Sequence, residues 1–318
     1  MTLPPVLQQP LTLPVIASPL FLASGPELVL AQCRAGVVGA FPALNARPAE
    51  LLSDWLDELN EKLSGDPTAA PFAVNQIVHR SNNRLEEDMA VLVKHRVPIV
   101  ITSLGARPEI NEAVHSYGGI VLHDVTTNRF AHKAIEKGAD GLIAVAAGAG
   151  GHAGAQSPFA LIREIRAWFD GPLALSGSIT HGRSILAAQA MGADFAYIGS
   201  AFLATKESNA PEPQKQLMFE STAEDIVYSN LFSGVHGNYL RGSITASGLD
   251  PDNLAQSDSS AMSFGTGAKT EAKAWRDIWG SGQGIGELTG SVTTQELVSR
   301  LKREYDEARE EMALLLSA

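Results

Sequence analysis

The sequence predicts an α/β fold, a closed (β/α)8 TIM barrel that carries a smaller, mainly helical inserted subdomain. The first observation is a set of eight short apolar runs rich in Val, Ile and Ala, each followed by a polar or glycine-rich break and then a segment with helical spacing. None of the runs alternates strictly between apolar and polar residues, as expected for parallel strands buried on both faces. Eight such units within about 205 residues favour a closed barrel over an open doubly wound sheet, which usually has about five or six parallel strands.

The predicted strands follow one another at regular intervals along the first two-thirds of the chain. In chain order they are Pro14–Ser18, Val37–Phe41, Phe72–Asn75, Ile99–Ser103, Ile120–Asp124, Leu142–Ala146, Leu173–Ser176 and Phe195–Ile198. The phrases EKGAD and AMGAD precede the sixth and eighth runs, and they place glycine where a helix must end and turn into the next strand. They are therefore repeated helix-to-strand corners of one fold.

Helices are predicted between the strands from start and stop signals. The segment Pro48–Ser64 carries leucines and Trp55 along one stripe, and Gly65 and Pro67 follow it as terminators. Proline at the first helical position, or glycine just after the last, marks most of the others. The further predicted helices are Leu85–His95, Pro108–Tyr117, Ala131–Lys137 and Pro158–Phe169.

The regular alternation breaks after Thr205. Residues 208–284 contain an amphipathic piece, Gln214–Ser221, then the stretch IVYSNLF and a long loop, and they are predicted to form a substrate-binding or lid subdomain. Residues 1–207 and 285–318 are predicted to form the barrel, and a long terminal helix, Thr294–Leu315, packs back on it.

Charge and composition exclude several classes of protein. With 24 Lys and Arg against 35 Asp and Glu, the chain has a formal charge of −11 and no basic cluster, so we expect no nucleic acid partner. We also expect no membrane segment and no secretory signal, and hence a cytoplasmic location. The lone cysteine, Cys33, is interpreted as a packed thiol, and the scattered histidines give no spacing for a metal site.

Small residues end the seventh and eighth strands. In α/β barrels the active site lies at the carboxyl ends of the strands, and a phosphate group is commonly held after strands seven and eight. Ser176, Gly177 and Ser178 end one of these strands, with a helix starting near Gly182, and Gly199 and Ser200 end the other. Either loop alone could be an ordinary tight turn. Because both loops follow the strands where a phosphate is expected, the pair favours a bound phosphate.

Polar residues also end the third, fourth and fifth strands. Asn75, Ser103 and His123 stand there, and their amide, hydroxyl and imidazole could hydrogen-bond a polar heterocycle such as an isoalloxazine ring. Leu20, after the first strand, could pack on the face of such a ring. Each residue alone also fits an ordinary turn, so the hypothesis rests on their shared position at one mouth of the barrel.

A glycine-rich stretch with one histidine follows the sixth strand. Glycines let the backbone approach a ligand closely, and His152 among them could act as a general base or as a hydrogen-bond donor, although a structural histidine is equally compatible with the pattern. A dinucleotide-binding loop is excluded here, because the G-x-G-x-x-G spacing is not met and no acidic residue ends the next strand.

Several longer motifs give the chain a family resemblance over nearly its whole length. They are PVIASPLFLAS, PFAVNQ, AGGHAG, LALSGSITHGRSILAAQAMGADFAYIGSAFLATKES and WGSGQGIG. With them the chain resembles the nitronate monooxygenases, formerly called 2-nitropropane dioxygenases, which are FMN-dependent (β/α)8-barrel flavoenzymes. Many members carry a glutamate where this chain has Gly148.

The resemblance implies a role for each part of the predicted mouth. His152 would be the catalytic base or would orient the substrate, and His236, Tyr239, Trp275 and Trp279 would belong to the lid. The residues implied to bind FMN are Asn75, Ala149 and Gly150 along the flavin, and Ser176, Gly177, Ser178, Gly199 and Ser200 at its phosphate.

The expected reaction is the oxidation of an alkyl nitronate or nitroalkane with O2 to a carbonyl compound and nitrite. A small-molecule substrate and O2 are thus the expected partners, with a homodimer left open. Two alternatives stand beside this expectation: an FMN-dependent NAD(P)H reductase of an enoyl thioester or quinone, and a non-enzymatic barrel that binds a phosphate ligand.

Overall fold

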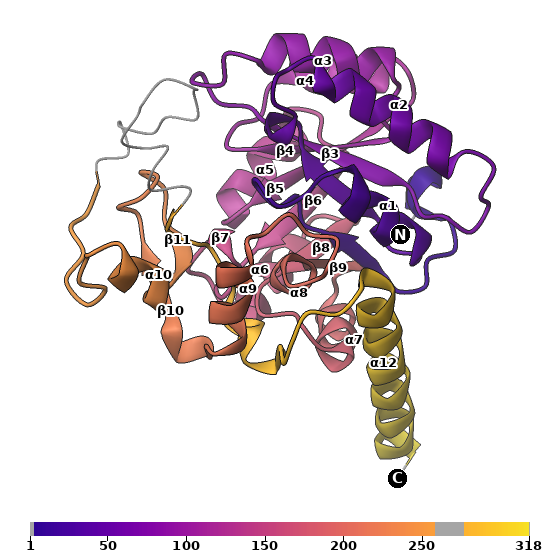
Figure 1. Cartoon of the computed structure of the whole chain (residues 1–318). Helices are drawn as coiled ribbons and strands as arrows, with labels where there is room; N and C mark the ends of the chain where they lie inside the picture. Colours follow the sequence, from indigo (N-terminus) through magenta and orange to yellow (C-terminus); the bar gives the residue numbers. More distant parts are fainter. Residues whose placement is uncertain (1–2, 258–276, 318) are drawn as a thin grey trace.

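The centre of the molecule is a barrel of eight parallel strands (Figure 1). The structure is a computed structural model that describes residues 3–257 and 277–317. The barrel strands are β1 (Val15–Ala17), β2 (Gly39–Pro42), β3 (Phe72–Ile77), β4 (Ile99–Ser103), β5 (Ile120–Val125), β6 (Gly141–Val145), β8 (Leu173–Ser176) and β9 (Phe195–Ile198). Each overlaps one of the eight predicted runs, so the predicted TIM barrel is confirmed.

The barrel closes between its first two strands. The strand order is β1-β9-β8-β6-β5-β4-β3-β2, and a parallel bridge between Ile16 and Val38 joins the two ends of this order. The amide of Ala17 donates to the carbonyl of Val38 (2.8 Å), and the amide of Val38 donates to the carbonyl of Val15 (3.1 Å). Closure leaves neither edge of the sheet unpaired.

Helices cover the outside of the barrel, and their starts follow the sequence signals. Pro26, Pro108 and Pro158 each occupy a first helical position, and Gly192 ends α7 in the left-handed conformation. The covering helices are α1 (Pro26–Arg34), α2 (Leu51–Leu63), α3 (Leu85–Lys94), α4 (Pro108–His115), α5 (Asn128–Glu136), α6 (Pro158–Arg166), α7 (Gly182–Met191) and α8 (Ser200–Leu203), with short 3-10 turns η1 (Pro5–Leu7) and η2 (Ala43–Asn45).

The hydrophobic core has two layers, one inside the barrel and one between the barrel and the helices. On β5, Ile120 and Leu122 belong to the inner layer, whereas Val121 and Val125 belong to the outer layer. Successive side chains of a strand point to opposite faces, so neighbouring residues at a strand end also face opposite ways. Cys33 lies in the outer layer, fully buried, and burial raises the pKa of its thiol to about 12, which confirms the packed thiol.

His123 belongs to the helix-facing side of the barrel. It shares the outward positions of β5 with Val121 and Val125, it is 6% exposed, and its Nδ1 lies 2.6 Å from the hydroxyl of Thr102 on β4. Burial lowers the pKa of this imidazole to about 4. The inward position next to it is taken by Asp124.

The inserted segment adds a small antiparallel sheet as well as helices. Its elements are α9 (Glu212–Phe219), η3 (Ala223–Asp225), β10 (Ile226–Ser229), β11 (Gly237–Leu240) and α10 (Arg241–Ala246). Strand β11 lies between β10 and β7 (Gly151–His152), so the insertion pairs with the loop that follows β6. Sequence reasoning missed this sheet, because β7 has only two residues and its partner lies far along the chain. The division at residues 208–284 stays a prediction.

The C-terminal helix α12 (Thr294–Ser317) follows η5 (Gln283–Glu287), and it packs against α7 before its end extends beyond the barrel (Figure 1). The contact is close at Gly182, where an added Cβ would lie 2.2 Å from the amide nitrogen of Tyr305 and 2.3 Å from the carbonyl oxygen of Leu301. Only glycine allows this backbone approach. None of the helices in residues 3–257 and 277–317 combines the length and the apolar character that a membrane span requires.

We expect Gly182→Ala to lower the free energy of unfolding by about 1–3 kcal/mol, because the methyl group would push α7 and α12 apart. The matched control is Gly290→Ala, at a position where an added Cβ would meet no atom within 4 Å. Urea unfolding of both variants checks this. Equal stabilities would show that the two helices tolerate the extra methyl group.

We expect the buried His123 to make the protein less stable in acid. Between pH 6.5 and about 4 the unfolded chain binds a proton at this imidazole and the folded chain does not, so the free energy of unfolding falls as pH falls. The contribution is about 1.4 kcal/mol per pH unit. Urea titrations of the wild type and His123→Gln across this range should therefore converge on acidification, and parallel curves would contradict the assignment.

Candidate active site

Three inward-facing side chains form a hydrogen-bonded row at the carboxyl ends of β3, β4 and β5. The Nδ2 atom of Asn75 donates to the hydroxyl of Ser103 (2.7 Å), and that hydroxyl donates to Oδ2 of Asp124 (2.5 Å). Burial raises the pKa of the Asp124 carboxyl to about 6, against the opposing effect of the Ser103 bond. The structure thus brings the predicted Asn75 and Ser103 together, and it adds Asp124, which sequence reasoning passed over in favour of His123.

The loops after β8 and β9 have the close backbone packing expected of ligand-binding turns. Gly177 has φ +142°, a Cβ on it would lie 2.7 Å from the carbonyl oxygen of Ala147, and Ser178 follows with φ 55°. Gly199 faces Leu20, with 3.5 Å between its hypothetical Cβ and Cδ2 of that leucine. Ser176 is 8% exposed at the end of β8. The predicted residues of β1, β8 and β9 therefore lie around the same mouth.

A segment near the end of the chain ties these loops together. The amide of Gly282 donates to the hydroxyl of Ser200 (2.9 Å), and the amide of Gln283 donates to the carbonyl of Gly148 (2.9 Å). Gly148 has φ +83°, and a Cβ there would lie 2.2 Å from the Ser178 hydroxyl. The positive φ and the neighbouring Ser178 side chain disfavour at Gly148 the glutamate that many nitronate monooxygenases carry there. A Cβ on Gly150 would likewise lie 2.7 Å from the amide nitrogen of Gly282.

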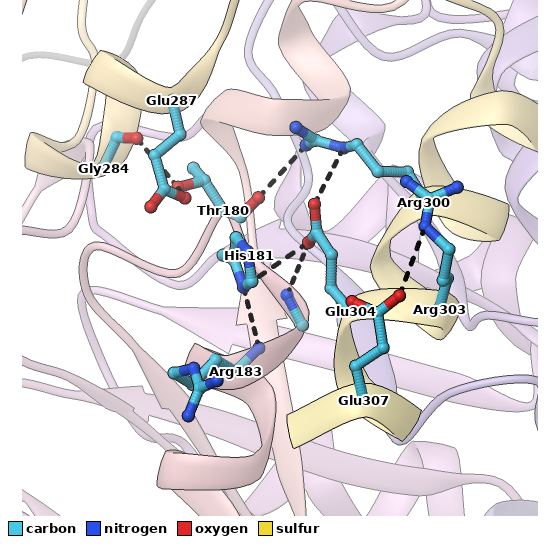
Figure 2. A network of polar contacts seen from close by, with 10 residues as sticks. Thr180, His181, Arg183, Gly284, Glu287, Arg300, Arg303, Glu304 and Glu307 are labelled. Carbon is cyan, nitrogen blue, oxygen red and sulfur yellow. Dashed lines mark hydrogen bonds and ion pairs between the residues drawn. The ribbon is translucent and has the colours of Figure 1, made fainter. Parts of the chain in front are cut away.

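The start of helix α7 is occupied by a carboxylate of this chain. Figure 2 shows Glu304 of α12 beside the first turn of α7, where Oε2 of Glu304 accepts from the amide of Gly182 (2.9 Å). The ring of His181 accepts from the amide of Arg183 (3.0 Å), and Arg300 lies on the other side of Glu304 (3.6 Å). The helix start near Gly182, expected to favour a phosphate, thus already holds a negative charge. The hydroxyl of Ser178 lies 3.5 Å from the carbonyl oxygen of Gly148, and the hydroxyl of Ser200 accepts from the amide of Gly282.

His152 is held as a neutral imidazole by the inserted segment. It pairs with Gly237 of β11, and its Nε2 lies 2.9 Å from the hydroxyl of Ser233. The hydroxyl of Ser233 donates its hydrogen to the carbonyl oxygen of Val235 (2.9 Å), and a carbonyl oxygen can only accept. We therefore assign the hydrogen of His152 to Nε2. Burial lowers the pKa of His152 to about 4.

Two of the four predicted lid residues, Tyr239 and His236, differ in how they reach His152. Tyr239 is buried, and its hydroxyl lies 3.5 Å from the hydroxyl of Ser233, one step from the imidazole. His236 contributes its backbone: its carbonyl accepts from the amide of Ala153 (3.1 Å), whereas its exposed ring stacks on Tyr228. Trp279 packs against the main core, and Trp275 lies outside the described residues.

The insertion also fixes the backbone before His152. Nδ2 of Asn238 donates to the carbonyl of Ala149 (2.6 Å), and the hydroxyl of Tyr228 donates to the carbonyl of Ala153 (2.9 Å). Sequence reasoning missed Ser233 and Asn238, because nothing in the sequence shows which residue of a distant loop meets the glycine-rich stretch. Across residues 3–257 and 277–317 no three His, Cys, Asp or Glu side chains gather in a way that could hold a metal ion.

A family model and a relative similar over nearly the full length point to the same family. The family model described as nitronate monooxygenase matches residues 13–304. A nitronate monooxygenase of Paraburkholderia phytofirmans is 27% identical over an alignment of 354 residues that covers 94% of each chain. A shorter match, to a protein of Mycobacterium tuberculosis, is 29% identical over 178 residues and covers 55% of this chain but only 48% of that protein.

A solved structure shares the fold over nearly the whole chain. The nitroalkane oxidase from Streptomyces ansochromogenes superposes with a TM-score of 0.78 at 24% identity, covering 96% of this chain and 99% of the other. The barrel, its inserted segment and its terminal helix therefore form a fold that occurs in a known enzyme. Since the family model spans nearly all of the sequence, the chain belongs to the nitronate monooxygenase family and is an oxidoreductase, as the sequence motifs predict.

Proposed function

We propose that this protein catalyses the FMN-dependent oxidation of an alkyl nitronate or nitroalkane with O2, giving a carbonyl compound and nitrite. The observation that carries the proposal is the neutral His152, held by Ser233 beside the loops that end β6, β8 and β9 in a member of this family. A neutral imidazole is the form that a general base requires.

The residues at the mouth fit FMN in their donor chemistry. Hydroxyls of Ser178 and Ser200, with the crowded glycine backbone around Gly177 and Gly199, suit a phosphate group that is bound mainly by backbone amides. The amide of Asn75 uses both hydrogens within the protein, so its Oδ1 is the atom that it offers to a ring N–H. Leu20 beside Gly199 supplies an apolar contact. Ser176, Ala149 and Gly150 complete the proposed cofactor site.

FMN, when bound, would supply the oxidation–reduction chemistry with O2. The neutral imidazole of His152 takes the α-proton of a neutral nitroalkane, and the contact of Nε2 with the Ser233 hydroxyl holds the ring in one orientation. A nitronate arrives without that proton and needs only positioning by His152. Tyr239, one hydroxyl away from His152, and His236 belong to the proposed substrate-binding side of the lid.

The absorption spectrum of the purified protein tests the cofactor. We expect a yellow protein, or one that gains bound-flavin absorption bands when FMN is added, because the loops of β8 and β9 present hydroxyls and backbone amides to a phosphate. A colourless protein whose spectrum with FMN equals the sum of the separate spectra would refute the proposal.

Two substitutions at His152 separate a base from an orienting group. His152→Gln keeps an N–H for Ser233 but has no basic nitrogen, and His152→Ala keeps neither. We expect His152→Gln to lower kcat/KM for a nitroalkane by about 10²–10⁴-fold and to lower it much less for the corresponding nitronate, which needs no base. Steady-state O2 consumption with both substrates measures kcat/KM, and we expect His152→Ala to lower kcat/KM for both. Equal losses of His152→Gln on the two substrates would assign His152 to orientation alone.

Anaerobic mixing with NADH or NADPH distinguishes the reductase alternative. For the proposed monooxygenase we expect bound flavin to keep its colour on the timescale of turnover and to bleach with the nitronate. Rapid bleaching by the nicotinamide would instead favour the reductase of an enoyl thioester or quinone.

A further inference from the structure

The row formed by Asn75, Ser103 and Asp124 has a fixed direction. The carbonyl of Ile101 can only accept, and Nδ2 of Asn75 lies 3.1 Å from it, so the NH2 group of Asn75 must face β4. The second hydrogen of that NH2 goes to the Ser103 hydroxyl at 2.7 Å. Ser103 thus accepts from one neighbour, and its single hydrogen goes to the Asp124 carboxyl at 2.5 Å.

Asp124 is the group that keeps Ser103 an acceptor. The Ile101 carbonyl sets this orientation of the Asn75 amide, and Asp124 removes what would compete with it, because without an acceptor on β5 the single hydrogen of Ser103 would be available to Oδ1 of a flipped amide. Asn75 and Ser103 are 5% and 7% exposed, so water has little access to replace a lost partner. The bond to a carboxylate is also stronger than a bond between neutral groups.

The consequence appears at Oδ1 of Asn75, which takes no part in the bonds of the row. Among the described residues, Oδ1 of Asn75 accepts none of the hydrogen bonds, while both hydrogens of the amide are in use. Asn75 lies in the carboxyl-terminal half of β3, toward the end of the barrel where ligands bind. The side chain therefore offers a ligand an acceptor only.

We propose that Asp124 is a positioning residue that acts through Ser103 to hold Asn75 with Oδ1 toward the ligand, so that the mouth selects a ring N–H donor such as the imide N3–H of an isoalloxazine. This inference rests on the proposed function, because FMN supplies the N–H. Asp124 itself need not touch the cofactor.

The hydrogen bond at N3 can be read directly with ¹⁵N-labelled FMN bound to the whole protein. In the wild type we expect the N3 proton to resonate downfield of its position in free FMN and to exchange slowly with water. In Asp124→Leu and in Ser103→Ala we expect the exchange of this proton to be about tenfold faster, because a single hydrogen bond is weakened or lost. Asp124→Asn keeps an acceptor oxygen for Ser103 and should restore slow exchange.

A matched control uses the other hydroxyl at the end of β4. Thr102 precedes Ser103 but faces the helices, where it bonds His123, so Thr102→Val disturbs the same strand without touching the row. We expect its N3 proton to behave as in the wild type. If Asp124→Leu fails to fold, Ser103→Ala still tests whether the row controls the exchange of the N3 proton.

The outcomes separate the two proposals. A wild type that binds FMN with an N3 proton like that of free FMN overturns the positioning role and leaves the proposed function standing. The same holds if Asp124→Leu and Ser103→Ala bind FMN with an unchanged N3 proton. A wild type that binds no FMN overturns both proposals.

Discussion

The closure of the barrel between β1 and β2 is the constraint on which the rest of the structure depends. The bridge at Ile16 and Val38 gives every strand two neighbours, so each strand has one face toward the barrel interior and one toward the helices. That alternation divides adjacent polar residues at the strand ends. Ser103 and Asp124 face inward, and their neighbours Thr102 and His123 bond to each other under the helices. Which polar side chains line the mouth of the barrel thus depends on their position along the strand as much as on their residue type.

The second level of organisation joins parts of the chain that are far apart in the sequence. His152 depends on Ser233, 81 residues later, and the loops at Gly148 and Ser200 meet through Gly282 and Gln283. The strand β7, only two residues long, is what lets the insertion hold the imidazole. Changes in the insertion can therefore reach the reacting groups without altering the barrel.

Electrostatics at the site is local and differs from the net charge of −11. Desolvation keeps two imidazoles neutral: the buried His123 on the helix-facing side of the barrel, and the half-buried His152 beside its mouth. Glu304 occupies the start of α7. A phosphate bound after β8, the seventh strand of the barrel, therefore has to rely on the Ser178 turn and on the loop after β9. An acidic protein can hold one phosphate in this way, because backbone amides supply the positive ends of the dipoles.

The sequence by itself determined the number and order of the barrel strands, the starts of α4 and α6 at their prolines, and the glycine-rich surroundings of His152. These features follow from local rules: apolar runs, start and stop residues, and the conformational freedom of glycine. Only the tertiary structure decided that Asp124 and not His123 faces inward, that Ser233 fixes the tautomer of His152, and that a carboxylate caps α7. A hydrogen bond forms between groups that are close in the folded structure. The insertion and α12 are far from their partners in the sequence, so these partners could not be predicted from the sequence.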